Sequence, residues 1–536
     1  MIPTAHVDTF ARDNLPAPQD MPVFINLEKL GYPDRLNVAT ELVDRHVAEG
    51  RGDRLAVVGE GAAWTFAELA GKVNRLASVL VAHGVVPGNR VLLRSANNPM
   101  MAALHFAVLK AGGIVVATMP LLRAKELGVI IDKAGIRLAV CDEALRGELE
   151  KACAGRDCRV LLFGTDAFEA EVAAASASFA ACDTAADDVC LIGFTSGTTG
   201  VPKGTMHFHR DLLAICDCYG ARVLRAGPDD RFIGSPPLAF TFGLGGLVLF
   251  PFRIGAAAIL LEKVSPDDLM PAIERHRATV LFTAPTAYRA MLGKLGEHDI
   301  SSLRKCVSAG EHLPRATFEA WRERTGITIL DGIGATEMLH IFIGAPQEKV
   351  RAGATGLPVP LYEAKVIGPD GEEVPDGEPG RLAVRGPTGC RYLADPRQRD
   401  YVQDGWNVTG DTYVRDGDGY YWYKARSDDM IITSGYNIAG PEVEAGLLTH
   451  PAVAEAGVVG APDPDRGQIA KAYVVLKEGH EPGPALVKAL QDHVKAELAP
   501  YKYPRAIEFV DRLPRTETGK LQRFALRQRA AAEAAA

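Results

Sequence analysis

The sequence predicts a large N-terminal α/β domain that includes a small β-barrel-like subdomain, followed by a small α+β C-terminal domain. Three observations favour this organisation. The chain has 536 residues, too many for one ordinary core. Short apolar runs alternate with helical patterns from about residue 54 to residue 330, and turn signals rich in glycine and proline dominate after about residue 353. A third pattern begins near residue 428, so we expect domains at 1–427 and 428–536.

The first segment is typical of layered α/β structure with parallel sheets. Short apolar runs of the kind found in buried strands occur at residues 91–93, 113–116, 138–140, 160–163 and 278–282. Between such runs we expect amphipathic helices. The clearest begins with a capping box of Thr65 and Glu68 and carries Leu69, Val73, Leu76 and Leu80 on one face.

The later segments have different patterns. After residue 353, turns such as Pro369-Asp370-Gly371 separate short runs, which indicates a small antiparallel, barrel-like subdomain. The last segment contains a helix with Leu486, Leu490, Val494 and Leu498 at intervals of four, as expected for a small α+β domain. The most apolar stretch, 244–261, contains a proline and an arginine, so we interpret it as buried strand and loop, not as a membrane span.

Composition and charge disfavour several classes of protein. The net charge of −8 disfavours a nucleic-acid-binding protein. Acidic residues near the N-terminus, with no apolar run after a basic start, disfavour a secretory signal. Nine cysteines, an odd number, favour a reducing cytoplasm. A metal site at His207, His209, Cys216 and Cys218 is disfavoured because the spacing is unusual for zinc and the cysteines lie on an apolar helical pattern.

The strongest local motif is Phe194-Thr-Ser-Gly-Thr-Thr-Gly-Val-Pro-Lys-Gly204, which follows an apolar run. Glycines let backbone N–H groups converge, hydroxyls add donors and a lysine adds positive charge, as a polyphosphate requires. The candidate ligands are Thr195, Ser196, Gly197, Thr198, Thr199, Gly200 and Lys203. The motif is not a Walker A loop, since no Gly-Lys pair in the chain is followed by serine or threonine. Taken alone, it would also fit a flexible surface loop.

Other segments follow the loop in a characteristic order: residues 308–314, 331–337, 408–411, 424–429 and 513–520. Together with the loop they resemble the motifs of the adenylate-forming superfamily, which includes acyl- and aryl-CoA ligases, luciferases and the adenylation domains of peptide synthetases. Each motif alone is weak, but their occurrence in order along nearly the whole chain is specific. The resemblance implies ATP, Mg²⁺ and coenzyme A as substrates and cofactor, with a mobile C-terminal domain.

The resemblance also implies roles for single residues. It places Gly310, Glu311, Asp331, Gly332 and Ile333 along the adenosine, Asp411 and Arg426 on the ribose, Thr336 on the α-phosphate and Glu337 on Mg²⁺. Lys520 is the implied catalytic lysine, because it would bridge the substrate carboxylate and the α-phosphate. Each residue has a simpler alternative: Glu337 and Lys520 as solvated surface charges, and Asp411 as a turn cap.

In the implied mechanism the carboxylate first attacks the α-phosphorus of ATP. The small domain then rotates about Asp428, withdraws Lys520 and brings Ser434 and Gly435 to line a tunnel for coenzyme A. Two positions depart from many relatives. Ile333 stands where a tyrosine stacks on adenine, and Asn437 stands where an arginine is common, so we assign Asn437 no catalytic role.

The acyl-pocket segment runs from Ser235 to Gly245 and includes Phe240, Thr241, Phe242 and Gly243. No acidic residue lies between Ser235 and Phe252, which argues against an α-amino acid substrate. The two phenylalanines would form a flat slot for an aromatic ring, although one or both could instead be core residues. Ala284, Gly334 and His340 complete the expected pocket.

Segments 41–52 and 331–342 resemble benzoate- and 2-aminobenzoate-CoA ligases in particular. We therefore expect a small aromatic carboxylate as partner, 2-aminobenzoate before benzoate. A neutral aniline nitrogen needs a hydrogen-bond partner, and His340 and Thr241 are candidates, unless both are structural.

Four alternatives stay open: a medium-chain acyl-CoA synthetase, aryl-acid adenylation for a separate carrier protein, a nucleotide-binding regulator that has lost catalysis, and a conventional P-loop kinase or ATPase. Retention of both Glu337 and Lys520 disfavours the regulator, because binding alone does not need the distant lysine, and the missing Walker A loop disfavours the kinase or ATPase. Symmetry base rates favour a homodimer.

Overall fold

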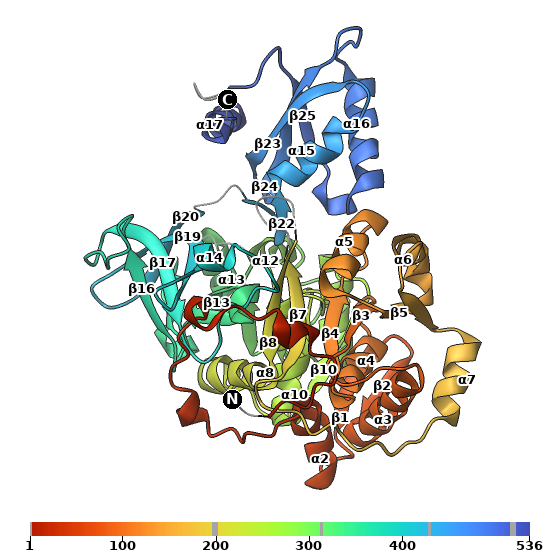
Figure 1. The fold of residues 1–536 in the computed structure, drawn as a ribbon. Helices are drawn as coiled ribbons and strands as arrows, with labels where there is room; N and C mark the ends of the chain where they lie inside the picture. The colour runs from red at the N-terminus through yellow and green to blue at the C-terminus, as the bar shows by residue number, and fades with distance from the viewer. Residues whose placement is uncertain are drawn as a thin grey trace.

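The computed structural model describes residues 3–195, 202–310, 313, 315–426, 430–514 and 521–535. Two large sheets and one smaller sheet form the body of the molecule, and a fourth sheet with its own helices forms a small C-terminal domain that stands on one side of it (Figure 1). The predicted fold class, a large α/β domain with a small α+β domain, is confirmed. The boundary at residue 428 stays a prediction.

The first sheet of the large domain has nine strands in the order β15-β14-β13-β12-β11-β9-β10-β1-β2. Its strands from β1 to β13 along this path are parallel, while β2, β14 and β15 are antiparallel edge additions. Their bounds are Leu55–Gly59 (β1), Ala62–Thr65 (β2), Arg231–Gly234 (β9), Ala257–Ile259 (β10), Val280–Thr283 (β11), Lys305–Ser308 (β12), Ile329–Gly334 (β13), Ile341–Gly344 (β14) and Leu357–Pro358 (β15).

The second sheet has six strands in the order β6-β5-β3-β4-β7-β8, all parallel except for the final β7–β8 pair. Their bounds are Arg90–Arg94 (β3), Ile114–Thr118 (β4), Leu138–Asp142 (β5), Arg159–Phe163 (β6), Val189–Thr195 (β7) and Lys203–Phe208 (β8). All five strands predicted from apolar runs are present, as β3, β4, β5, β6 and β11. The phosphate-loop motif connects β7 to β8, whose last pair is Thr195 with Lys203.

Helices cover these two sheets. The predicted amphipathic helix is α3, and its capping box is present: the Thr65 hydroxyl accepts from the Glu68 amide while the Glu68 carboxylate accepts from the Thr65 amide. Its Leu69, Val73 and Leu76 are fully buried in the main core. The helices are α1 (Phe10–Asp13), α2 (Arg45–Ala48), α3 (Phe66–Ala82), α4 (Pro99–Lys110), α5 (Ala124–Ala134), α6 (Arg146–Cys153), α7 (Asp166–Ala174), α8 (His209–Ile215), α11 (Pro266–His276), α12 (Pro285–Leu292) and α13 (Arg315–Thr325).

The apolar stretch 244–261 differs from its prediction. Most of it is helical, through α9 (Thr241–Leu244), the π-helical η6 (Gly245–Leu249) and α10 (Phe250–Ile254), and only β10 is a strand. Our assignment of this stretch to strand and loop was therefore wrong for its first half. A segment buried on every side shows no amphipathic period, so a helix and a strand cannot be told apart by pattern.

The third sheet is antiparallel and forms the small barrel-like part of the large domain, with strand order β16-β17-β19-β18 and β20 paired to β19. Its strands are Glu363–Ile367 (β16), Pro379–Arg385 (β17), Val402–Gln403 (β18), Trp406–Arg415 (β19) and Tyr421–Arg426 (β20), and α14 spans Gln398–Tyr401. The glycine- and proline-rich turns predicted from the sequence separate these strands, as expected for short antiparallel connections.

The small C-terminal domain is a five-stranded mixed sheet with its own core. Its strands are Met430–Thr433 (β21), Tyr436–Ala439 (β22), Val453–Asp463 (β23), Gly467–Leu476 (β24) and Ala506–Phe509 (β25), and its helices are α15 (Gly440–Leu448), α16 (Pro484–Glu497) and α17 (Arg523–Ala535). The predicted helix is α16, from which Leu490 and Val494 are fully buried.

Three further predictions from the sequence concern the cysteines, a metal site and a membrane span. All nine cysteines are free in the structure, and seven of them are buried. No group of three metal-ligating side chains forms within the described ranges, so His207, His209 and the nearby cysteines are not arranged as a metal site. In the part of the chain that the structure describes, each helix is too short or too polar for a bilayer span.

Candidate active site

A cavity of about 580 Å³ lies where the two large-domain sheets meet the small domain. The segments that line it come from the carboxyl ends of β4, β7, β11 and β13, from α5, α9 and α12, and from β22 and η9 (Pro500–Lys502) of the small domain. Eleven of the predicted site residues line it: Thr195, Phe240, Thr241, Phe242, Ala284, Gly310, Gly334, Thr336, His340, Ser434 and Gly435. The carboxyl ends of parallel strands are the usual position of ligands in such sheets.

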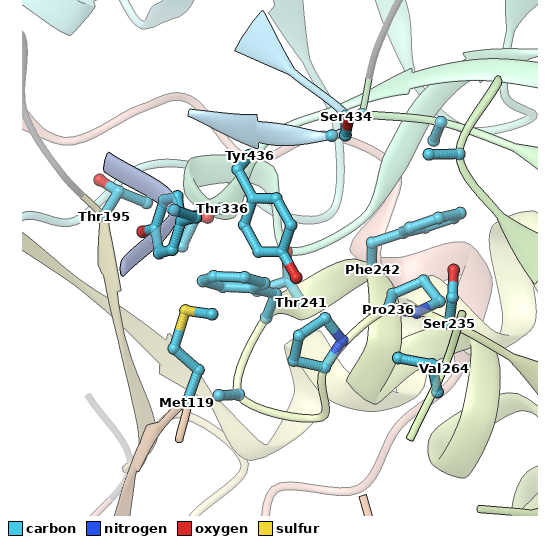
Figure 2. A pocket seen from close by; sticks show the side chains of 18 of the residues that line it. Met119, Thr195, Ser235, Pro236, Thr241, Phe242, Val264, Thr336, Ser434 and Tyr436 are labelled. Atoms are coloured by element: carbon cyan, nitrogen blue, oxygen red, sulfur yellow. The ribbon is translucent and has the colours of Figure 1, made fainter. Parts of the chain in front are cut away.

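One end of the cavity is an aromatic slot. The Phe242 ring lies 5.7 Å from the His340 ring and 5.6 Å from the Phe282 ring, measured between centroids, and Phe250 packs edge-on against His340 at 4.6 Å. Figure 2 shows Phe242 on the same side of the cavity as Ser235 and Pro236, facing the open space. Phe240 and Phe242 are both partly exposed to the cavity. Flat apolar walls of this kind accommodate an aromatic ring.

His340 is the polar group of this slot. Its side chain is buried, and neither ring nitrogen makes a well-formed hydrogen bond within the described structure. Burial lowers the pKa of His340 to about 3, although a contact with the Phe242 backbone opposes part of this shift. The imidazole is therefore neutral near pH 7 and offers one donor and one acceptor. The preceding residue, Leu339, has a φ of 71°, a left-handed conformation that is uncommon for leucine and often found at functional sites.

Lys203, Glu337 and Tyr392 form a second polar cluster at the base of the phosphate-loop hairpin. The Lys203 Nζ lies 3.4 Å from Glu337 Oε1 and 2.7 Å from the Tyr392 hydroxyl, which itself donates to Glu337 Oε1. Burial raises the pKa of Glu337, but the Lys203 charge and the Tyr392 hydrogen bond outweigh it and hold the pKa below its usual range. The carboxylate is therefore ionised near pH 7.

This cluster fits a magnesium ion that is bound together with nucleotide phosphates. Glu337 offers a hard anionic oxygen, and Mg²⁺ typically binds through one or two carboxylates while keeping waters and phosphate oxygens as its other ligands. Thr195, at the end of β7, lines the cavity and adds a buried hydroxyl without a partner among the described residues. Such an unsatisfied hydroxyl is suited to a phosphate oxygen.

A buried network of polar side chains contacts the backbone at Thr336. The His207 Nε2 lies 2.8 Å from the Thr336 carbonyl oxygen, and since a carbonyl only accepts, this nitrogen carries the proton. The neighbouring Asp211 pairs with Arg391 at 2.7 Å, and both side chains are fully buried. This network fixes the loop that carries Thr336 and Glu337.

The predicted adenosine residues lie along the ends of β12, β13 and β19. Gly310 has a φ of 92°, which favours glycine, and lines the cavity beside Gly435. Asp331 Oδ1 is buried beside the Ser308 hydroxyl and the Gly332 backbone. Burial dominates over these two contacts, which lower the pKa of Asp331, and raises that pKa to about 8. Gly332 packs tightly against Ile341, and Ile333 is partly buried against the main core.

The two residues predicted to bind the ribose are adjacent in the barrel-like sheet. Asp411 on β19 is directly opposite Arg426 on β20 in the antiparallel register. The structure thus places the two predicted ribose residues next to each other in the backbone, although they are fifteen positions apart in sequence.

The small domain contributes the third wall of the cavity. Ser434 and Gly435 have φ values of 47° and 81°, and this tight turn before β22 brings the backbone to the cavity. The Tyr436 ring projects into the cavity between Thr336 and Phe242 (Figure 2) and packs 4.5 Å from the Tyr501 ring. Leu513 and Leu521, which flank the predicted catalytic lysine in sequence, pack instead around Gly457 inside the small domain.

Some predicted residues are not in the cavity or cannot be placed. Gly243 faces away from it: a Cβ there would lie 2.2 Å from the Pro237 carbonyl oxygen, so this glycine is needed for close packing. Ser196, Gly197, Thr198, Thr199, Gly200, Glu311, Asp428 and Lys520 lie outside the described residues.

Sequence reasoning missed several residues that the fold brings to the site. Tyr392 and His207 belong to no recognised motif, and Tyr436, Tyr501 and Lys502 come from segments that carry no polyphosphate signal. The only available hint was the neighbourhood of Tyr436 to the predicted tunnel residues Ser434 and Gly435.

Comparison with known proteins agrees with this geometry. Residues 44–392 match the family model described as AMP-binding enzyme, and residues 442–520 match the AMP-binding enzyme C-terminal domain. A benzoate–CoA ligase of Thauera aromatica is 38% identical over 510 residues, covering 92% of this chain and 96% of the relative.

Solved structures give the same result. The anthranilate CoA ligase AuaEII in complex with anthranoyl-AMP is 35% identical with a TM-score of 0.73, covering 95% of this chain and 99% of its own. A benzoate CoA ligase from Burkholderia xenovorans LB400 is 34% identical with a TM-score of 0.70, covering 92% and 100%. The matched family models cover most of both domains and most of the cavity lining, while Ser434, Gly435 and Tyr436 lie between the two matched ranges. The chain therefore belongs to the AMP-binding enzyme family, and it is an enzyme of the AMP-forming acid–thiol ligase type.

Proposed function

We propose that this enzyme is an aryl-CoA ligase that activates an aromatic carboxylate, 2-aminobenzoate in preference to benzoate. The first half-reaction joins the carboxylate to the α-phosphate of ATP and releases pyrophosphate, giving the aryl-AMP. The second transfers the aryl group to the thiol of coenzyme A and releases AMP. The benzoate and anthranilate ligases named above support this class of substrate.

The observation that carries the substrate proposal is the neutral imidazole of His340 in the wall of an aromatic slot, where it makes no well-formed hydrogen bond within the described structure. A buried polar group without a partner costs about 1–3 kcal/mol, and a ligand that supplies the partner recovers that free energy. The amine of 2-aminobenzoate is neutral near pH 7 and can both donate and accept a hydrogen bond. A neutral histidine is therefore a better protein partner for this amine than an aspartate or glutamate carboxylate would be. A purely aliphatic acid would leave the imidazole unsatisfied.

In the first half-reaction the described residues bind and orient the phosphates. Lys203 and the Thr195 hydroxyl would neutralise and hydrogen-bond the leaving pyrophosphate, while Thr336 would contact the α-phosphate. Glu337 would hold Mg²⁺, which when bound adds charge stabilisation on the phosphate oxygens. The predicted role of Lys520 is to bring the two anionic groups together, and it comes from the sequence motif alone.

In the second half-reaction the thiol of coenzyme A attacks the carbonyl carbon of the aryl-AMP, the carbon–oxygen bond to AMP breaks, and the thiol proton is lost to solvent. The turn at Ser434 and Gly435 lies at the cavity, as a tunnel for the pantetheine arm requires. A side chain at Gly435 would narrow this passage. The position of this turn supports a small-domain orientation suited to thioester formation.

The test of the substrate proposal is His340→Leu, assayed by the formation of aryl-CoA from 2-aminobenzoate, benzoate and a medium-chain fatty acid. We expect kcat/KM for 2-aminobenzoate to fall by about 10- to 100-fold, since a hydrogen bond in a buried site is lost. Benzoate has no amine, so its kcat/KM should change by less than about threefold.

His298→Leu is the matched control, because His298 lies on the surface and pairs with Glu274 far from the cavity. An equal loss for both aromatic acids in His340→Leu would contradict the assignment of the amine to His340. Wild-type preference for the fatty acid would contradict the aromatic proposal itself. Aryl-AMP that accumulates without reacting with free coenzyme A would instead indicate a carrier protein as acceptor.

A further inference from the structure

The two domains meet at a buried cluster of three charged side chains. The Lys502 ammonium, at the end of η9, lies 2.5 Å from Glu126 Oε1 on α5 and 2.8 Å from Glu442 Oε1 on α15. Glu126 belongs to the large domain, whereas Lys502 and Glu442 both belong to the small one. The helix α5 stands at the edge of the large domain that faces the small domain (Figure 1).

These charges are almost fully withdrawn from water. The side chains of Lys502, Glu126 and Glu442 are 4%, 7% and 12% exposed. Burial lowers the pKa of Lys502, but Tyr501, Glu126 and Glu442 raise it above its usual value, so the ammonium stays charged. An ammonium at this depth is costly unless it is paired, so the docked position of the small domain depends on its partners.

Only one of the two partners crosses the domain interface. Glu442 moves with Lys502, so their contact persists whatever the domain orientation. Glu126 also accepts the Ala499 backbone N–H at 3.1 Å and caps its own helix by accepting from the Arg123 N–H at 2.9 Å. The Glu126 carboxylate is thus held in place by its own helix, and it binds segment 499–502 through two contacts, the Ala499 backbone N–H and the Lys502 ammonium.

The same residues stand at the cavity. Glu126, Tyr501 and Lys502 contribute to its lining, and Tyr501 packs against Tyr436, which follows the tunnel turn at Ser434 and Gly435. The contacts of Glu126 with segment 499–502 therefore influence the position of this turn, because Tyr501 of that segment packs against Tyr436. Rotation of the small domain would separate Lys502 from Glu126 and move the turn out of the cavity.

We propose that Glu126 and Lys502 form a latch that holds the small domain in the thioester-forming orientation, which makes them positioning residues for the second half-reaction. This inference rests on the proposed two-step function. It assigns Glu126, Lys502 and the backbone at Ala499 to domain orientation and not to contact with the reacting atoms. The latch is absent from any orientation in which the small domain has rotated away.

The test separates the two half-reactions in Glu126→Gln, Lys502→Met and the double variant. Adenylation is followed by exchange of labelled pyrophosphate into ATP with 2-aminobenzoate, and thioester formation is followed in a single turnover of preformed aryl-AMP with coenzyme A. We expect each single variant to slow the thioester step by at least about tenfold, because Glu126→Gln removes the charge that pairs with Lys502 across the interface and Lys502→Met leaves Glu126 and Glu442 without the cation between them. Adenylation should stay within about twofold of wild type or rise.

The double variant distinguishes a direct pair from two separate effects. If the two side chains act on each other, the double variant should slow the thioester step by the same factor as the slower single variant. Two independent effects would instead slow it by the product of the two single-variant factors. Lys488→Met is the matched control, because it removes a lysine from an exposed pair with Asp492 on the same domain. This control should leave both half-reactions unchanged.

The outcomes are distinct. A wild-type protein that exchanges no pyrophosphate with any aromatic acid would contradict the proposed function, not the latch. With both wild-type half-reactions active, an unchanged thioester step in Glu126→Gln would overturn the latch. An equal fall of both half-reactions in variants whose thermal unfolding matches wild type would overturn it as well.

Discussion

At the scale of single residues, the polar groups in and beside the cavity fall into two kinds. Glu337 is satisfied within the protein, since Lys203 and Tyr392 both contact its carboxylate. Thr195 Oγ1 and the His340 ring nitrogens make no well-formed hydrogen bond with any described residue. Buried polar groups are usually paired, so the second kind marks the positions where we expect ligand atoms.

Tyr392→Phe tests whether the protein contacts of Glu337 organise its carboxylate. The change removes a hydroxyl that accepts from Lys203 and donates to Glu337 while it keeps the ring that lies 4.7 Å from the lysine ammonium. We expect the pyrophosphate exchange rate to fall about tenfold, because lysine and carboxylate lose their shared hydrogen-bond partner. The concentration of Mg²⁺ needed for half-maximal rate should rise, while KM for the acid stays constant.

Tyr420→Phe provides the control, since its hydroxyl bonds the Lys349 carbonyl away from the cavity. A normal Mg²⁺ requirement in Tyr392→Phe, with exchange at the wild-type rate, would show that the tyrosine does not organise the carboxylate.

Sequence motifs had identified Lys203 and Glu337 but not Tyr392. The tyrosine lies 55 positions after Glu337, and only the fold brings the two together.

At the scale of elements, the helical stretch from α9 to α10 shapes the aromatic slot through its glycines. A Cβ at Gly245 would lie 2.4 Å from the His340 ring, and one at Gly246 would lie 2.4 Å from the Phe282 ring. Both rings pack among other aromatic side chains and have little room to move. Small residues here let the helix approach the rings that line the slot.

Gly245→Ala is therefore expected to push the His340 imidazole and to raise KM for 2-aminobenzoate by about tenfold, with KM for ATP unchanged. Overpacking of this kind costs about 1–3 kcal/mol, so the melting temperature should fall as well. Steady-state kinetics and thermal unfolding check the two effects.

The matched change is Gly71→Ala in α3, where a Cβ would meet no atom within 4 Å. That variant should be more stable by up to about 1 kcal/mol, because alanine favours a helix over glycine, and its kinetics should equal wild type. Gly245→Ala with an unchanged KM for the acid would show that the glycine does not set the position of the imidazole.

At the scale of the whole molecule, much of the fold followed from sequence pattern. The parallel strands, α3 with its capping box, the antiparallel turns after residue 353 and the helix α16 all match their predictions, because each has a local period or a turn signal. The stretch 244–261 failed because it is apolar on every side. Long-range contacts such as Lys502 with Glu126, 376 positions apart, leave no local signal at all.

The site shows the same division. Ordered motifs predicted the nucleotide residues, and the cavity gathers eleven of the predicted residues from both domains. Specificity depends on the shape of the slot, which arises from rings on separate elements, so the preference for 2-aminobenzoate over benzoate stays a proposal. Domain orientation likewise depends on contacts that form only in the folded chain.

The central claim is tested most directly by measuring nucleotide products in the presence of ATP, Mg²⁺, coenzyme A and a panel of acids: benzoate, 2-aminobenzoate, 4-hydroxybenzoate, a medium-chain fatty acid and acetate. We predict AMP and pyrophosphate with the aromatic acids, fastest with 2-aminobenzoate, and loss of at least about a hundredfold in Lys520→Ala. ADP in place of AMP, or no product with any of the acids, would contradict the account.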